Sequence, residues 1–249
     1  MNSAQRLYEL LAEASQAGDS DKTRDVWAKA FHLPEEYQGP KLNAEVSMKL
    51  SALHQELEAL RASMNDTFVP EEVFEPPLRK VESAISPTNI GAQWRSFSKH
   101  ITPEVLLSLR YNSAILGVQE RPIDEDELDS LIEEVRELEQ KLKEADLSPA
   151  VKALIERHVE SIMFALSDYR IKGASAIKEA VHKAAGDLIE HKEDIATSRD
   201  SEAVTRLGQL WFRVTQIGDS VVKADRAIES GKRMWALIEP VFKSGSGAG

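Results

Sequence analysis

The sequence predicts an all-α protein, in which an antiparallel bundle of long helices is joined to a smaller N-terminal helical subdomain and no sheet forms. Apolar residues recur at alternating steps of three and four over long stretches, which places them on one face of a helix. No segment alternates β-branched or aromatic residues with polar ones, as a strand would. With 249 residues and no cysteine, the chain is expected to bury a core without disulfides.

Four parts are predicted along the chain. Residues 1–67 form the N-terminal helical subdomain, 68–101 a proline-rich connector with short helices, 102–243 the C-terminal helical bundle, and 244–249 a flexible tail. The connector is expected between residues 68 and 89 because four of the ten prolines lie there, and proline removes a backbone donor. The tail reads SGSGAG, a composition typical of flexible linkers.

The N-terminal subdomain opens with two short helices, over residues 4–16 and 21–31. Between them AGDSD supplies helix stop and cap signals. A longer helix is predicted over residues 43–64, because six apolar residues there form one seam: Val46, Leu50, Leu53, Leu57, Leu60 and Met64. Such a seam predicts a long neighbouring helix. In the connector that follows, Phe68, Val69, Val73 and Phe74 are expected to pack on the bundle surface.

The C-terminal bundle begins with a helix that Thr102 caps, with Pro103 in its first turn, and that stops near Gly117. An acidic helix over residues 124–146 comes next. The turn DLSPAV then begins another helix, because Ser148 supplies a cap just before a proline at the first helical position.

Two further helices complete the predicted bundle. One follows Gly173 and carries alanines on a single stripe, which lets two helices approach closely. The last is predicted as a single helix from Val204 to Ile238, which at 1.5 Å per residue would span about 50 Å. Its seam of alternating threes and fours fits a bundle helix or a coiled coil with a second copy.

The net charge of −11 is concentrated in the acidic helix, where eleven acidic and three basic residues lie between residues 124 and 146. The rest of the chain is nearly balanced and has no basic stripe, so binding of duplex nucleic acid is not expected. The pairs Glu137 with Lys141 and Glu139 with Lys143 favour a solvated helix face. The alternative is a surface for a basic partner, with contacts at Glu133, Glu134 and Glu137.

No membrane segment or leader is expected in this chain. Its first residues lack a basic start followed by an apolar run, and no window approaches the 18 apolar residues of a membrane span. The lack of cysteine fits a reducing cytoplasm, which is the expected location.

One pair of residues raises the alternative of RNA cleavage. In WRSFSKH, residues 94–100, Arg95 and His100 have the spacing of the catalytic pair in a class of helical, metal-independent ribonucleases. There the arginine grips a phosphate and the histidine moves a proton. However, fifteen arginines and six histidines make one such pair expected by chance. Ser96 also stands where that class commonly has Asn, Asp or His, and Thr102 begins a new helix nearby.

Metal ligation has weaker signals. Glu179 and His182 have the Glu-x-x-His spacing of carboxylate di-iron bundles, but a second copy of that spacing is missing. Asp187, Glu190 and His191 would add ligands to a weak site, although a hydrated helix end explains them equally well. No metal and no other cofactor is therefore expected, and the sequence has no phosphate-binding loop or nucleophile elbow.

Aromatic residues on the last predicted helix suggest contacts with a partner, because such side chains dominate interface energetics. Trp211 and Phe212 are the candidate partner contacts. Trp235 falls on the apolar seam and is expected in the core. His158 lies near the seam of its own helix and is expected to be a core or boundary histidine rather than a metal ligand.

Residues 124–190 resemble a recurrent helical segment of bacterial proteins whose functions are unassigned. The resemblance rests on the opening DEDELDSLIEEV, the turn ADLSP and the stretch SDYRIKGASAIKEAVHKAAGDL, and it covers about a quarter of the chain. It implies a bacterial cytoplasmic origin, in an accessory or mobile-element setting, but no activity and no catalytic residue.

Together these features predict a non-catalytic protein that binds another protein, as an interaction or regulatory scaffold. Two alternatives stay open at this point. One is a ribonuclease that uses Arg95 and His100, and the other is a structural homodimer formed through residues 204–238.

Overall fold

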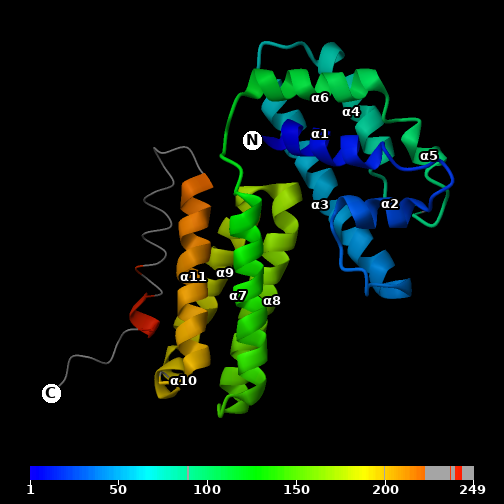
Figure 1. Ribbon diagram of the computed structural model, residues 1–249. Coiled ribbons are helices and arrows are strands. Elements are labelled where there is room, and N and C mark those ends of the chain that lie inside the picture. The colour runs from blue at the N-terminus through cyan, green and yellow to red at the C-terminus, as the bar shows by residue number, and fades with distance from the viewer. Residues whose placement is uncertain (89, 199, 222–235, 237–238, 243–249) are drawn as a thin grey trace. The chain divides into compact units, whose positions relative to one another are not determined.

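The computed structural model describes residues 1–88, 90–198, 200–221, 236 and 239–242, and most of these residues lie in helices (Figure 1). In this described part no strand forms, and one isolated antiparallel bridge links Lys22 to Gln93. The predicted all-α class is confirmed. Of the helices described, none combines the length and the apolar character that crossing a bilayer requires.

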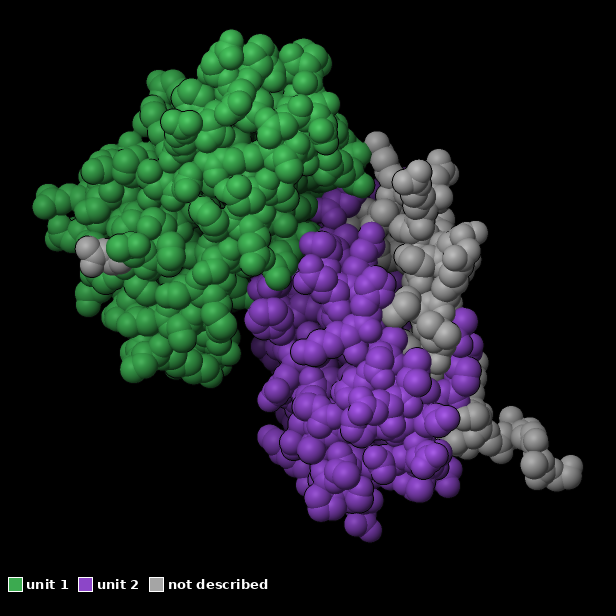
Figure 2. Space-filling model, turned by 180° about the vertical axis from the view of Figure 1, so that it is seen from behind, with its two compact units in different colours: residues 1–119, 170–173 green, residues 120–169, 174–249 purple. Residues whose placement is uncertain are grey.

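The chain forms two compact units, coloured separately in Figure 2. Unit 1 consists of residues 1–119 and 170–173, and unit 2 of residues 120–169 and 174–249. These limits differ from the predicted boundaries after residues 67 and 101, because the segment expected to connect two parts is itself helical and belongs to unit 1.

Unit 1 contains six helices of the described chain: α1 (Ser3–Ala14), α2 (Thr23–Ala30), α3 (Gly39–Asn65), α4 (Glu71–Ala84), α5 (Arg95–Ser98) and α6 (Pro103–Leu116). The seam predicted on α3 is confirmed, since all six of its apolar residues are fully buried. Its neighbours are α1, α2, α4 and α6, all much shorter than α3. The single long partner predicted for this helix is therefore wrong, because several short helices cover one long seam equally well.

The helix α4 occupies residues 71–84 of the predicted connector. Pro76 and Pro77 lie inside it and each removes one backbone donor, but Phe74, Leu78 and other inner residues are buried against the core of unit 1. Burial of this apolar face stabilises a helix that the two prolines weaken. Phe68 and Val73 do not pack as predicted, for both side chains are exposed.

Asn2 joins the start of α1 to the end of α6. Its side-chain Oδ1 accepts a hydrogen bond from the Gln5 backbone N–H at 3.0 Å and caps α1. Its Nδ2 donates to the carbonyl oxygens of Ser113 at 2.9 Å and Gly117 at 2.7 Å. Because this buried amide satisfies groups on both helices, α6 packs with α1 and α4 rather than in the C-terminal bundle to which it was assigned.

Unit 2 contains α7 (Glu125–Glu144), α8 (Pro149–Lys172, of which residues 170–172 belong to unit 1), α9 (Ala174–Glu190), α10 (Lys192–Thr197) and α11 (Glu202–Val221). The predicted start of α8 is confirmed: Pro149 is its first residue, and the Ser148 hydroxyl accepts a hydrogen bond from the Val151 N–H at 3.3 Å. Gly173, with φ +60°, separates α8 from α9 as expected, because this left-handed conformation costs glycine little.

The single helix predicted from Val204 to Ile238 is described only over its first part. α11 is described as far as Val221, and residues 222–235, 237–238 and the tail at 244–249 lie outside the described residues, so the core placement of Trp235 does too. A Cβ atom on Gly208 would lie 3.0 Å from the ring of Phe242. Phe242 therefore lies against α11.

Candidate protein-binding surface

The helix α6 has apolar side chains on two opposite faces. Its inner face buries Val105 and Leu109 in the core of unit 1. Its outer face carries three exposed apolar side chains at steps of four, and a fourth follows just beyond the helix end. These four side chains are between 37% and 62% exposed, and we call them the α6 strip: Leu107, Tyr111, Ile115 and Val118. Residues four apart lie in one line along a helix, so the three helical members form a continuous row.

The ends of α6 fix the position of the strip. Pro103 lies in the first turn, where its missing N–H costs no helical hydrogen bond. At the other end Gly117 adopts φ +66°, its N–H donates to the Ser113 carbonyl at 3.0 Å, and Asn2 holds both carbonyls. Val118 follows directly, outside the helix.

The strip itself carries no charge. Glu104 and Arg110 are the charged exposed side chains of α6, and the Arg110 guanidinium lies 5.8 Å from the centre of the Tyr8 ring. Single exposed apolar residues are ordinary on a protein surface, but a continuous row of them marks an interaction site. A helix that is apolar on both faces is ordinarily covered on both.

Sequence reasoning overlooked the α6 strip. The signal was present, because apolar residues follow one another at Val105, Leu106 and Leu107 and again at Ala114, Ile115 and Leu116. Such runs put apolar side chains on more than one face of a helix. The prediction treated the segment as an ordinary bundle helix with one buried face.

The acidic residues predicted as partner contacts are engaged within unit 2. Glu137 accepts from Arg206 on α11 at 2.9 Å, and Glu134 pairs with Arg213 on the same helix. Glu133 pairs with Arg136 one turn along α7, at 2.7 Å. A basic partner would have to compete with these arginines for all three carboxylates.

Trp211 is fully buried, and its ring packs edge-to-face on His158 with ring centres 5.7 Å apart. The prediction that Trp211 contacts a partner is therefore wrong: the side chain belongs to the core of unit 2, where the apolar seam of α11 places it. Phe212, the next residue, points to the other side of the helix and is partly exposed. His158 is buried in the core, one of the two positions expected for it.

Arg95 and His100 do not share a helical turn. Arg95 begins the four-residue helix α5 and is exposed, whereas His100 lies beyond the helix end at Ser98. Burial lowers the pKa of His100, and the charges of Lys99 and Lys80 lower it further. Within the described residues, no hydrogen bond joins the two side chains. The geometry that motivated the ribonuclease alternative is absent from this part of the chain.

The candidate metal ligands of the sequence analysis divide into two groups. Glu179 and His182 are exposed on α9. By contrast, Asp187, Glu190 and His191 come together at the end of α9, where one donor atom from each lies within 4.8 Å of the others.

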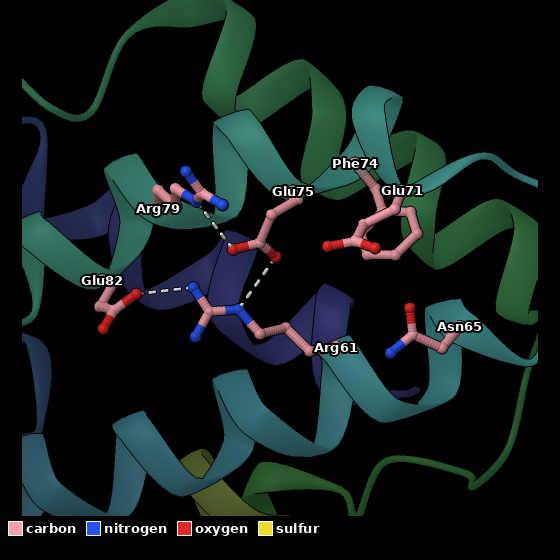
Figure 3. A pocket seen from close by; sticks show the side chains of 7 residues that line it. All are labelled: Arg61, Asn65, Glu71, Phe74, Glu75, Arg79 and Glu82. Atoms are coloured by element: carbon pink, nitrogen blue, oxygen red, sulfur yellow. Dashed lines mark hydrogen bonds and ion pairs between the residues drawn. The ribbon is translucent and has the colours of Figure 1, made fainter.

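A pocket of about 400 Å³ lies between α3 and α4 in unit 1. Figure 3 shows Arg61 at its centre, with its guanidinium between Glu75 at 3.1 Å and Glu82 at 2.6 Å. Glu58 is a third partner. Burial acts to lower the pKa of Arg61, but hydrogen bonds to Glu82, Glu58 and Glu75 outweigh it and raise that pKa. Because these carboxylates occupy the arginine, we interpret the cluster as a link between two helices.

Comparison of the chain with family models, with curated proteins and with solved structures finds no match. The resemblance of residues 124–190 to a bacterial helical segment therefore stays a prediction. Among the described residues, the α6 strip gathers four exposed apolar side chains at one helix and its end.

Proposed function

We propose that this protein acts by binding another protein along the α6 strip and that it has no catalytic activity. The observation that supports the proposal is the row of three exposed apolar side chains on α6, with Val118 just beyond the helix end, on a helix whose opposite face is already buried. In water such a row is unfavourable, and covering it with a partner removes the apolar area from solvent.

The strip suits an amphipathic helix of the partner. Its helical part, from Leu107 to Ile115, is one side chain wide and about 12 Å long at 1.5 Å per residue. Its lack of charge favours an apolar seam on the other side of the interface, packed as one helix packs on another. Tyr111 is the most exposed of the four, and tyrosine is enriched among residues that contribute most to binding.

The setting that we propose is a bacterial cytoplasmic scaffold, as the resemblance of residues 124–190 implies. The two alternatives have less support. The ribonuclease requires Arg95 and His100 on one turn, and the homodimer requires a continuous helix over residues 204–238; the described residues favour neither arrangement.

Affinity capture of the tagged chain from the cells that produce it tests the proposal. Tyr111→Ser combined with Ile115→Ser removes the centre of the strip, and Phe68→Ser is the matched control, because Phe68 is an 88% exposed apolar residue of unit 1 outside the strip. We expect one stoichiometric protein companion with the unaltered chain and the control, reduced about tenfold or more by the double substitution.

Equal recovery of protein companions with the unaltered chain, the double variant and the Phe68→Ser control would contradict the proposal. So would light scattering that shows the unaltered chain as a homodimer and the double variant as a monomer. The ribonuclease alternative is tested with His100→Ala, which we expect to leave companion binding unchanged. Cleavage of RNA by the unaltered chain and not by this variant would favour that alternative instead.

A further inference from the structure

Three basic side chains near α6 form no ion pair in the described part of the chain. Lys80 is exposed on α4, Lys99 is exposed directly after α5, and Arg110 is exposed on α6 itself. None of them lies within ion-pair distance of a described carboxylate. We call these three residues the basic rim. A cation without an ion pair is available to the acidic side chain of a partner.

Two of the three cations lie at the start of α6. Lys99 comes four residues before Pro103, the first residue of the helix, and α4, which carries Lys80, packs against α6. Burial lowers the pKa of His100, and the charges of Lys99 and Lys80 lower it further. Because charges in salt solution act on one another only over short distances, both ammonium groups lie close to His100, just before the helix.

The α6 strip extends from this end of the helix past the third cation. Leu107 lies about one turn from the helix start, and Arg110 directly precedes Tyr111. The Arg110 guanidinium lies 5.8 Å from the centre of the Tyr8 ring, which places it on the flank of the strip next to α1. Glu104, the acidic exposed side chain of α6, offsets one of the three positive charges. The apolar row is therefore bordered by an excess of positive charge.

We infer that the basic rim selects a partner helix with acidic residues beside its apolar seam. The inference rests on the proposed function, because it names the chemistry of the partner that covers the α6 strip. When two helices pair, apolar side chains form the seam and the charges beside it decide which partner is accepted. Glutamate or aspartate beside the seam pairs with the rim, whereas lysine or arginine there is repelled by it.

The overall charge of the chain acts in the opposite direction. With a net charge of −11, the chain as a whole repels an acidic ligand and attracts a basic one. A preference for an acidic helix therefore has to come from charges close to the binding surface. Nucleic acid is also an anion, but its phosphate backbone supplies no apolar seam to cover the strip, so the observations favour an acidic helix.

Two synthetic peptides of about 18 residues test the inference, because this length allows an isolated helix to form. Both carry the same row of leucines, with glutamate beside it in one peptide and lysine at the same positions in the other. Fluorescence anisotropy of labelled peptide at trace concentration measures each dissociation constant for the full chain. We expect the glutamate peptide to bind about fivefold more tightly at low salt, and this preference to decrease in about 0.5 M sodium chloride.

Charge reversal within the basic rim gives the decisive variant. Lys99→Glu combined with Arg110→Glu should abolish the preference for the glutamate peptide, because two of the attracting cations become repelling anions. Lys22→Glu combined with Lys29→Glu is the matched control. Both lysines are exposed in unit 1, at the start and in the last turn of α2, and the two substitutions change the net charge by the same amount. We expect this control to keep the preference.

Equal affinities of the two peptides for the unaltered chain would overturn the inference. If Tyr111→Ser with Ile115→Ser then weakened both peptides, the proposed function would still stand. Loss of the preference in the control as well as in the rim variant would overturn the inference too, as would no binding of either peptide below about 1 mM. Binding of single-stranded RNA that the rim variant abolishes, without peptide binding, would assign the rim to nucleic acid instead.

Discussion

Asn2 donates a hydrogen bond of 2.7 Å to the carbonyl oxygen of Gly117, 115 residues further along the chain. This contact fixes the end of α6 against the start of α1, and with it the position of Ile115 on the outer face. The α6 strip is therefore held on a rigid part of unit 1, as a binding surface should be.

Asn2→Asp should destabilise unit 1 by about 2 kcal/mol. Aspartate still caps α1, but it cannot donate to the carbonyls of Ser113 and Gly117, and it places a carboxylate against both oxygens in a buried position. Chemical denaturation of the full chain measures the change. Asn43→Asp is the control, because Asn43 is partly exposed and its Oδ1 already accepts from Arg24. Equal unfolding midpoints for the two variants would contradict this role of Asn2.

Arg61→Ala should cost unit 1 about 2 kcal/mol or more, because it leaves Glu75 and Glu82 close together without their cation in a partly buried pocket. Arg61→Lys should restore only part of the stability, since an ammonium group cannot hold both carboxylates as the planar guanidinium does. Arg79→Ala, which removes a more exposed partner of Glu75, should change the free energy of unfolding little. The order of the three unfolding midpoints tests the interpretation of the cluster as a helix link.

The chain should lose stability as the pH falls from about 6.5 to about 4. Burial lowers the pKa of His158 to about 4, despite the opposing charge of Asp187. The unfolded chain takes up this proton first, so the stabilising contribution is complete above pH 6.5 and decreases as the pH falls through this window. The contribution of His158 to the free energy of unfolding is about 3 kcal/mol at most, because each pKa unit corresponds to about 1.36 kcal/mol.

The control for this pH dependence is His158→Gln, which removes the titrating group while Asp187, Arg157 and His191 stay in place. Unfolding free energies of both chains are measured at several pH values, and their difference isolates His158 from the carboxylates that titrate in the same range. A difference that does not change between pH 6.5 and 4 would show that His158 titrates normally in the folded chain.

Gly186→Ala should stabilise unit 2 by up to about 1 kcal/mol, because alanine favours a helix over glycine and a Cβ at this position of α9 meets nothing within 4 Å. Gly208→Ala should lack that gain, since its Cβ lies 3.0 Å from the ring of Phe242 and forces the ring to move. Thermal unfolding compares the two substitutions. If both stabilise the chain equally, the contact between Gly208 and Phe242 does not form in solution.

Much of the local structure follows from the sequence. Leu50 and Leu57 on α3 lie where the apolar seam places them, and Ser148 and Gly173 mark a helix start and a helix end as their chemistry predicts. These features depend on residues close together in the chain, where periodicity and capping act directly.

The long-range arrangement does not follow from such patterns. The pairing of Glu137 with Arg206 joins α7 to α11 across 69 residues, and periodicity alone gives no partner for either side chain. The contact of Gly208 with Phe242 could not be predicted either, because apolar residues at steps of three and four do not show where one helix ends and another begins. The candidate residue Trp211 was misplaced for a related reason: aromatic residues serve cores and interfaces alike.

Site-specific photocrosslinking from the α6 strip tests the central claim most directly. A benzophenone amino acid placed at Tyr111 is irradiated in the cells that produce the protein, and the same amino acid at Phe68 serves as the control. Binding of another protein along the strip predicts one dominant adduct of defined mass from position 111 and none of that mass from position 68. No adduct at position 111, or the same adducts from both positions, would contradict the claim.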